Sequence, residues 1–140
     1  MEDTYDLERF VSAQATMYPR VLAELQAGEK RSHWIWFIFP ELKGLGFSEV
    51  SQFYGIGSLE EAAAYWRHPV LGPRLEECVR LVSRVEGKTI QQILGSPDDL
   101  KFRSSMTLFG LAVPEVAVFG EALKKCFGGE ADARTLDLLR

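Results

Sequence analysis

Two polar clusters in the sequence have residue types and spacing that could support chemistry. The first is the run Lys30-Arg31-Ser32-His33, which places two cations, a hydroxyl and an imidazole next to Trp34. This run falls where a helix is expected to begin. Exposed helix N–H groups beside cations and an aromatic ring are what a phosphorylated or nucleotide-like ligand needs. The competing interpretation is a solvated basic turn followed by an aromatic core helix.

The second cluster lies on one predicted helix, whose Leu100, Met106 and Leu108 must be buried. Its polar members are Asp98, Asp99, Lys101, Arg103, Ser104, Ser105 and Thr107. Helical periodicity places Lys101 on the face of Leu108, together with Ser104 or Ser105, so some polar atoms approach the apolar side. Such hydroxyls either bond back to the carbonyl four residues earlier or act as a nucleophile with a lysine as base. The sequence shows no third group to orient that pair.

Three further side chains bear on a site. Trp34 and Trp36 cannot both point the same way on a helix, because neighbours on one face lie three or four residues apart. We expect Trp34 to border a pocket and Trp36 to join the core. Gln14 lies on an apolar helical stripe, so its buried amide needs a structural partner or a ligand. The histidines and cysteines lack zinc-ligand spacing, and no phosphate loop is present, so no metal or cofactor is predicted.

The elements that position these residues are all predicted to be helical. Capping boxes mark helix starts at Ser58 and Thr89, and Ser96-Pro97 marks another. Glycines 44 and 46 indicate an ordered loop in which Leu45 and Phe47 would be covered. We expect an all-α, single compact domain, residues 1–140, of about eight short helices in an orthogonal array. The first expected helix runs from Leu7 to Gly28 with a break at Pro19, the next lies near Ser32 to Pro40, and a short one covers 48–54. Further helices are expected to start at Ser58, to run from His68-Pro69 to Gly87, to start at Thr89, and to run from Ser96 through Leu111. The last two run from Pro114 to Gly128 and from Asp132 to Leu139.

Composition excludes several classes of protein. Hydrophobic residues make up 46% of the chain and charged residues 26%, as in ordinary globular domains. The net charge of −4 argues against a surface built for nucleic acid. The longest apolar run, residues 34–39, is far shorter than the ~20 residues that cross a bilayer. With no signal-peptide pattern, we expect a cytoplasmic protein in which Cys78 and Cys126 are reduced. Its oligomeric state is not indicated.

Four stretches resemble the bacterial domain-of-unknown-function family eighteen-ten, a family often labelled calpastatin. They are residues 6–14 (DLERFVSAQ), 30–40 (KRSHWIWFIFP), 68–75 (HPVLGPRL) and 101–109 (KFRSSMTLF). The resemblance implies an all-helical intracellular domain with no established activity. A disordered repetitive inhibitor such as calpastatin would have a very different composition. The matching polar positions are Gln14, Lys30, Arg31, Ser32, His33, Arg74, Lys101, Ser104, Ser105 and Thr107.

A fainter similarity links the chain to helical domains that process ADP-ribose and related N-glycosides. It implies that the regions of His33 and Lys101 meet around a ribosyl or phosphate group. Glu41 or Asp99 would then stabilise cationic ribosyl character or activate water. Glu41 stands where the family pattern usually has Gln, and its charge weakens a simple anion site.

Two functions therefore remain open. In the first, His33, Trp34, Arg74 and Lys101 converge on a cavity that binds or processes a phosphorylated or nucleotide-derived small molecule. In the second, the aromatic segment and the loop from Gly44 to Phe47 form a patch that binds a protein partner. That second function predicts a contiguous exposed apolar surface.

Overall fold

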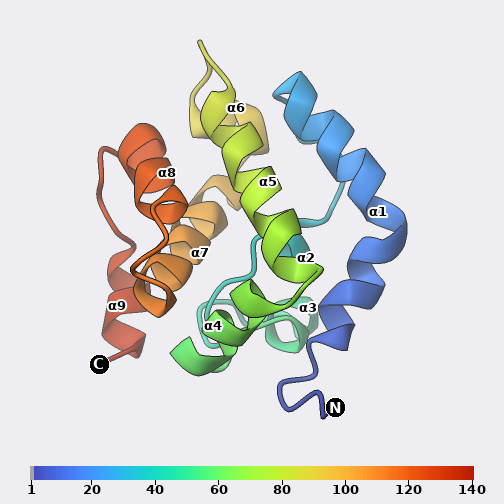
Figure 1. Ribbon diagram of the computed structural model, residues 1–140. Coiled ribbons are helices and arrows are strands. Elements are labelled where there is room, and N and C mark those ends of the chain that lie inside the picture. The colour runs from blue at the N-terminus through green and yellow to red at the C-terminus, as the bar shows by residue number, and fades with distance from the viewer. Residues whose placement is uncertain (1) are drawn as a thin grey trace.

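The computed structural model describes residues 2–140, and within that range its regular elements are nine helices and no strand (Figure 1). This confirms the all-α prediction. The helices are α1 (Glu8–Ala27), α2 (Ile35–Ile38), α3 (Glu49–Phe53), α4 (Leu59–Arg67), α5 (Leu71–Arg84), α6 (Ile90–Leu94), α7 (Asp98–Ala112), α8 (Val118–Phe127) and α9 (Ala133–Leu138).

Helix α7 occupies the centre of the fold. It packs against α4 and α8 and also contacts α2, α6 and α9. Six consecutive residues, from Ser104 to Phe109, are buried on it. A helix buried on nearly every side must satisfy its own hydroxyl groups, since few solvent-facing positions remain.

The predicted break of the first helix at Pro19 is wrong. Helix α1 continues through Pro19, whose side chain is exposed, and ends at Gly28 with a left-handed φ of 72°. A proline inside a helix removes one backbone hydrogen bond and strains the preceding turn. Here the apolar stripe of Phe10, Val21 and Leu25 is buried on both sides of the proline. Packing of that stripe on the core therefore outweighs the local cost.

The capping signals predicted several helix starts correctly. Ser58, Thr89 and Asp132 each accept a hydrogen bond from a backbone N–H of their helix, and Thr89 forms a complete capping box. The start predicted with Ser96 as the cap and Pro97 as the first helical residue is wrong by one residue, because α7 begins at Asp98 with Pro97 at the cap position and no side-chain cap. Pro114 also does not open α8, which begins at Val118.

The glycine-rich segment between α2 and α4 folds back on itself. The Lys43 N–H donates to the Ile56 carbonyl at 2.8 Å, and the Ile56 N–H donates to the Glu41 carbonyl at 2.9 Å. These two bonds close a loop that carries α3, and we call residues 44–55 the roof segment. Leu45 is buried as predicted, but Phe47 is 78% exposed, because α3 buries none of its residues and offers Phe47 no cover.

The remaining global features concern the thiols and the membrane. Cys78 is buried, Cys126 is half-buried and both are free. Over residues 2–140, no helix has the length and hydropathy needed to cross a membrane.

Candidate functional site

The first polar cluster is saturated by a carboxylate from α1. Glu24 accepts hydrogen bonds from the backbone N–H groups of Arg31 at 2.9 Å and Ser32 at 3.0 Å. It also accepts from the Ser32 hydroxyl at 2.6 Å and from the Trp34 indole N–H at 2.9 Å. Burial alone would raise the pKa of Glu24, but these hydrogen bonds lower it to about 2. The N–H groups predicted to hold a phosphate are therefore occupied by the protein's own anion.

The charged residues of that cluster also have internal roles or face solvent. The Lys30 ammonium pairs with Asp98 at 2.7 Å, donates to the Ser32 carbonyl and lies 4.9 Å from the centre of the Trp34 ring. Its side chain is only 5% exposed. Arg31 is exposed and pairs with a neighbouring glutamate, and His33 is exposed. Lys30 thus joins the two predicted clusters as a structural ion pair.

The two tryptophans exchange the positions predicted for them. Trp34 is completely buried, because its indole N–H reaches Glu24 inside the protein. Trp36 is half-buried and borders a pocket. Trp34 therefore lines no open cavity, and its neighbour two residues along does.

The polar groups of Gln14 and Arg74 bond to other residues of the same chain. The Gln14 amide donates to the Phe37 carbonyl at 2.6 Å and to the Tyr65 hydroxyl at 3.0 Å. Its oxygen accepts from Arg74 at 3.3 Å, and the Arg74 guanidinium lies over the Tyr18 ring. This network joins α1 to α2, α4 and α5, so the amide has the structural partners that its burial requires.

The hydroxyls of α7 mostly bond within their own helix. Ser104 donates to the Leu100 carbonyl at 3.1 Å and Thr107 to the Arg103 carbonyl at 2.9 Å. The fully buried Ser105 hydroxyl and one oxygen of Asp99 have no hydrogen-bond partner in the described part of the chain. Lys101 is the charged member of this cluster that lines the pocket described next.

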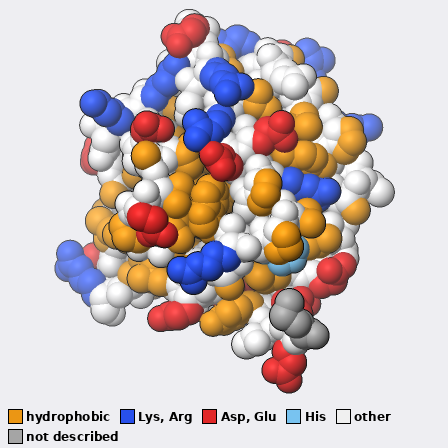
Figure 2. All heavy atoms as spheres, in the orientation of Figure 1, with side chains coloured by type: hydrophobic (Ala, Val, Ile, Leu, Met, Phe, Trp, Pro, Cys, Tyr) orange, Lys and Arg blue, Asp and Glu red, His pale blue; other side chains and the backbone are white. Residues whose placement is uncertain are grey.

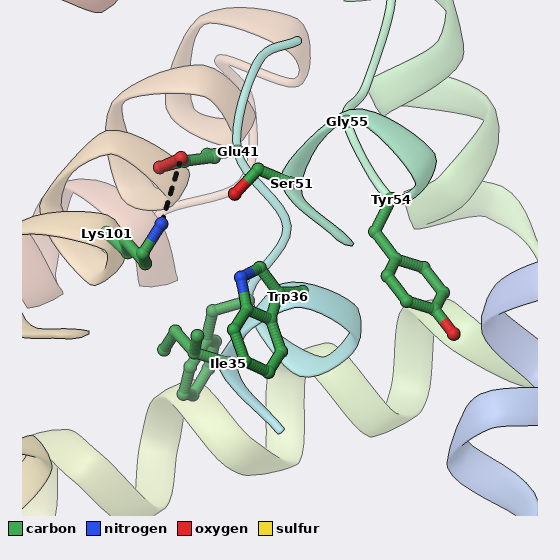
Figure 3. Close-up of a pocket in the computed structure, with 8 residues that line it drawn as sticks. Ile35, Trp36, Glu41, Ser51, Tyr54, Gly55 and Lys101 are labelled. Atoms are coloured by element: carbon green, nitrogen blue, oxygen red, sulfur yellow. Dashed lines mark ion pairs between the residues drawn. The ribbon is translucent and has the colours of Figure 1, made fainter. Parts of the chain in front are cut away.

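Four polar groups from three segments point into one small space beside Lys101 (Figure 3). They are the Lys101 ammonium, the Glu41 carboxylate, the Trp36 indole nitrogen and the Ser51 hydroxyl. Lys101 and Glu41 lie 3.7 Å apart, which is longer than a direct hydrogen bond, and their side chains are 20% and 14% exposed. The space between these groups is about 10 Å³, enough for roughly one water molecule.

The electrostatic balance of this pocket is close to neutral. Burial raises the pKa of Glu41 above its ordinary value, and the nearby Asp132 raises it further, while Lys101 and Arg134 oppose the change. Two carboxylates and two cations therefore act on one another here. A carboxyl group with a raised pKa can exchange protons nearer neutral pH than an ordinary glutamate.

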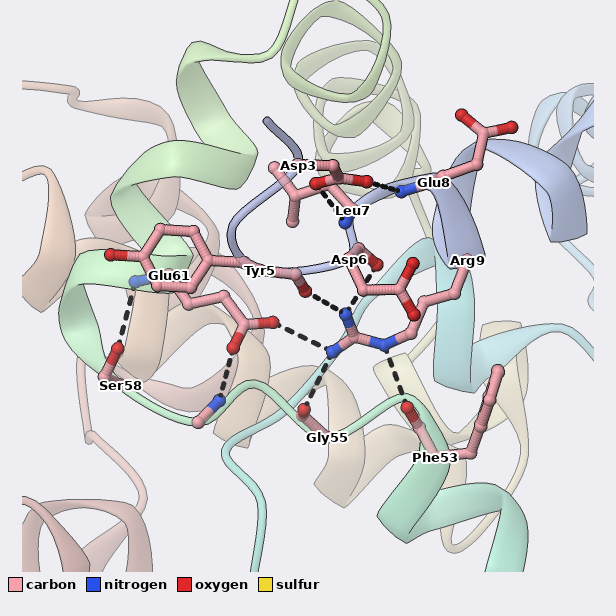
Figure 4. Close-up of polar contacts among 11 residues, drawn as sticks. Asp3, Tyr5, Asp6, Leu7, Glu8, Arg9, Phe53, Gly55, Ser58 and Glu61 are labelled. Atoms are coloured by element: carbon pink, nitrogen blue, oxygen red, sulfur yellow. Dashed lines mark hydrogen bonds and ion pairs between the residues drawn. The ribbon is translucent and has the colours of Figure 1, made fainter. Parts of the chain in front are cut away.

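Arg9 fixes the far end of the roof segment (Figure 4). All five of its N–H donors are used, which requires acceptors placed all around the edge of the planar guanidinium. The acceptors are the carbonyls of Tyr5, Asp6, Phe53 and Gly55 and the carboxylate of Glu61. At the near end of the roof segment, Arg134 donates to the Leu45 carbonyl at 3.4 Å.

Sequence reasoning missed three kinds of residue that build this site. Trp36 and Ser51 line the pocket, Arg9 anchors its roof segment and Glu24 fills the predicted anion site. A usable signal existed for Glu24, because a single acid on the apolar stripe of the first helix calls for buried donors. The described residues contain no group of three or more His, Cys, Asp or Glu placed to hold a metal ion.

A solved structure shares this fold over nearly its whole length. It is the conserved hypothetical protein Rv1873 from Mycobacterium tuberculosis, with a TM-score of 0.97 and 55% sequence identity over 98% of each chain. No curated protein matches the chain. The family model described as a protein of unknown function (DUF1810) matches residues 4–139. The chain therefore belongs to the DUF1810 family, in agreement with the resemblance seen in its four sequence stretches.

Proposed function

We propose that the protein binds a nucleotide-derived small molecule through its sugar hydroxyls at the pocket of Glu41 and Lys101. One observation carries this proposal: Lys101, Glu41, Trp36 and Ser51 point toward a shared space. Within residues 2–140, the indole N–H of Trp36 donates no hydrogen bond to the protein. The Ser51 oxygen accepts from Ser48, which leaves its own proton free to donate.

The chemistry of these groups favours hydroxyls over a bare phosphate. Lys101, Trp36 and Ser51 supply donors, and Glu41 supplies a carboxylate that accepts. A sugar hydroxyl both accepts and donates, so two neighbouring hydroxyls match this set, in the way that an acidic residue binds ribose in dinucleotide-binding folds. A phosphate would meet the Glu41 charge as well as the Lys101 charge, and the pocket has no surplus of positive charge to compensate.

Entry of a sugar requires the roof segment to move. The present space holds about one water molecule, which is much smaller than a pentose ring. The roof segment suits such movement because α3 buries no residue and its Phe47 and Phe53 are exposed. Its ends are tied by Arg134 and Arg9, so the middle can open while both ends stay attached.

Thermal shift with a panel of nucleosides, nucleotides and ADP-ribose tests this proposal. For the wild type we expect a ribose-containing compound to stabilise the fold by about 2.7 kcal/mol at a hundredfold excess over its Kd. Glu41→Gln and Lys101→Met should lose most of that gain. His33→Ala should keep it, because His33 is exposed and outside the pocket. Equal gains in all four proteins, or no gain in the wild type, would reject the proposal.

A double variant separates lost binding from lost folding. The half-buried pair of Glu41 and Lys101 is not in hydrogen-bond contact, so its attraction repays little of the cost of burying two charges. We expect Glu41→Gln/Lys101→Met to unfold in urea with a free energy equal to that of the wild type or about 1 kcal/mol higher. A protein of that stability that no longer binds the compound would place the lost groups in the binding site.

A second candidate function is a protein-interaction surface on the roof segment. Phe47, Val50 and Phe53 are 78%, 41% and 57% exposed, which is unusual for three large hydrophobic residues in one short segment. A partner that cross-links to the wild type and to His33→Ala, but not to Phe47→Ser/Phe53→Ser, would support this function. Equal cross-linking of all three proteins would count against it.

A further inference from the structure

A second cavity, of about 310 Å³, lies between α7, α8 and α9 and shares no lining residue with the Glu41 pocket. Hydrophobic side chains gather on the side of the molecule where α8 and α9 lie (Figure 2). The volume is at the lower end of the range of small-molecule sites. The cavity is about thirty times larger than the space beside Lys101, so it needs no movement of the chain to admit a ligand.

The lining of this cavity is apolar and aliphatic. Among the residues that the structure describes, no charged and no aromatic residue borders it; Leu111, Val116, Leu123 and Leu136 form much of its wall. Its one hydroxyl, on Thr107, donates to the Arg103 carbonyl and accepts from the Asp132 N–H, so its strong donor is already used. A polar ligand group placed here would lose its hydration without finding a partner.

The cavity stays open because the chain around it is tethered. The Asp132 N–H donates to Thr107, and the Arg103 side chain donates to the Glu130 carbonyl at 2.9 Å. These two bonds hold residues 130–132, which directly precede α9, against α7. Asp132 then caps α9. The residues that could fill the space are small, since Gly110, Gly120, Ala117 and Ala131 line it. A Cβ atom added at Gly120 would meet no atom within 4 Å.

We propose that this cavity binds the alkyl or acyl chain of a small molecule. Its aliphatic walls fit a flexible hydrocarbon chain and provide no ring to stack on an aromatic ligand. A protein partner fits poorly, because Leu111 is the one strongly exposed large hydrophobic residue of the lining, and stable interfaces bury about 800 Å² on each side. The proposal is independent of the Glu41 pocket.

Titration with straight-chain fatty acids of six to twelve carbons, below their micelle concentrations, tests the proposal by calorimetry. The affinity should rise about fourfold for each added methylene, the factor that corresponds to about 0.8 kcal/mol per buried CH₂. Gly120→Leu should reduce the affinity at least tenfold, since Gly120 lines the cavity and a Cβ atom added there meets no atom within 4 Å, which leaves room for a leucine to occupy the ligand's space. Glu121→Leu, at an exposed neighbouring position of α8, controls for added hydrophobicity and should bind like the wild type.

The same titrations contain the results that would overturn the proposal. These are an affinity that does not depend on chain length, equal binding by Gly120→Leu and the wild type, or no saturable binding up to millimolar acid. Gly120→Ala guards against misfolding of the leucine variant, because it enters open space on a helix and should fold normally with an intermediate affinity. Glu41→Gln should leave the fatty-acid affinity unchanged, whether or not the Glu41 pocket binds a sugar.

Discussion

Replacement of Glu24 by Gln tests whether this carboxylate organises the segment between α1 and α2. The carboxylate accepts four hydrogen bonds from Arg31, Ser32 and Trp34, and its residue is only 9% exposed. Gln has the same shape, but its amide nitrogen would face donors instead of accepting from them. Buried donors left without an acceptor are costly, and charged acceptors form the stronger hydrogen bonds.

The size of the effect follows from the pKa of Glu24. A fall from 4.5 to about 2 corresponds to about 3 kcal/mol of folding free energy when the group is ionised in both states. Because the folded pKa is the lower one, this stability is fully present above pH 4.5 and is lost as the pH falls toward 2. We therefore expect Glu24→Gln to lower the free energy of unfolding by about 3 kcal/mol at pH 7 and by about 2 kcal/mol at pH 3.5.

Urea unfolding followed by far-ultraviolet circular dichroism at both pH values provides the measurement. Glu29→Gln is the matched control, because Glu29 pairs with Arg31 on the surface with a 53% exposed side chain. Its replacement should cost less than about 0.5 kcal/mol at either pH. A loss below 0.5 kcal/mol for Glu24→Gln, or a loss that does not shrink at the lower pH, would refute the role assigned to this carboxylate.

Two further pairs of substitutions test other buried groups by the same unfolding assay. Arg9→Met leaves Glu61 buried without its cation and should lower the free energy of unfolding by about 3 kcal/mol. Arg9→Lys should recover little of that loss, because an ammonium cannot reach five acceptors. Full recovery of stability by Arg9→Lys would contradict the hydrogen-bond network. Ser105→Ala removes a buried hydroxyl with no partner and should raise stability by up to about 1 kcal/mol, whereas Ser104→Ala removes a bonded hydroxyl and should not; equal effects would show that Ser105 is satisfied.

Local rules predicted most of the fold and failed where packing opposed them. Cap residues such as Ser58 and Thr89 act over three or four residues, so the sequence contains their partners. The break predicted at Pro19 was wrong because the cost of a proline in a helix is local, whereas the burial of Phe10 and Leu25 that outweighs this cost depends on contacts with other helices. The prediction for Phe47 failed for the opposite reason, since the loop was expected to cover this side chain and leaves it 78% exposed.

The candidate site was predictable in part by residue type. Glu41 and Lys101 were selected from the sequence, and the fold brings them together across sixty positions. The run at Lys30 was predicted to bind an anionic ligand, whereas its Arg31 and Ser32 N–H groups bind Glu24 of the same chain. Sequence patterns identify the chemistry a segment can do, while the fold decides whether the partner is a ligand or another part of the protein. Trp36 shows this limit, because its orientation depends on which face of α2 meets α7.

The five acceptors around Arg9 also set an order of events during synthesis. Two of them, the carbonyls of Tyr5 and Asp6, leave the ribosome before the arginine itself, while Phe53, Gly55 and Glu61 follow 44 to 52 residues later. Helix α1 can therefore form early, but its first turn keeps a hydrated guanidinium until α4 has been made. The beginning of the chain is locked into place by its middle, so a nascent chain stopped before Glu61 should leave residues near Arg9 open to proteolysis that the finished protein resists.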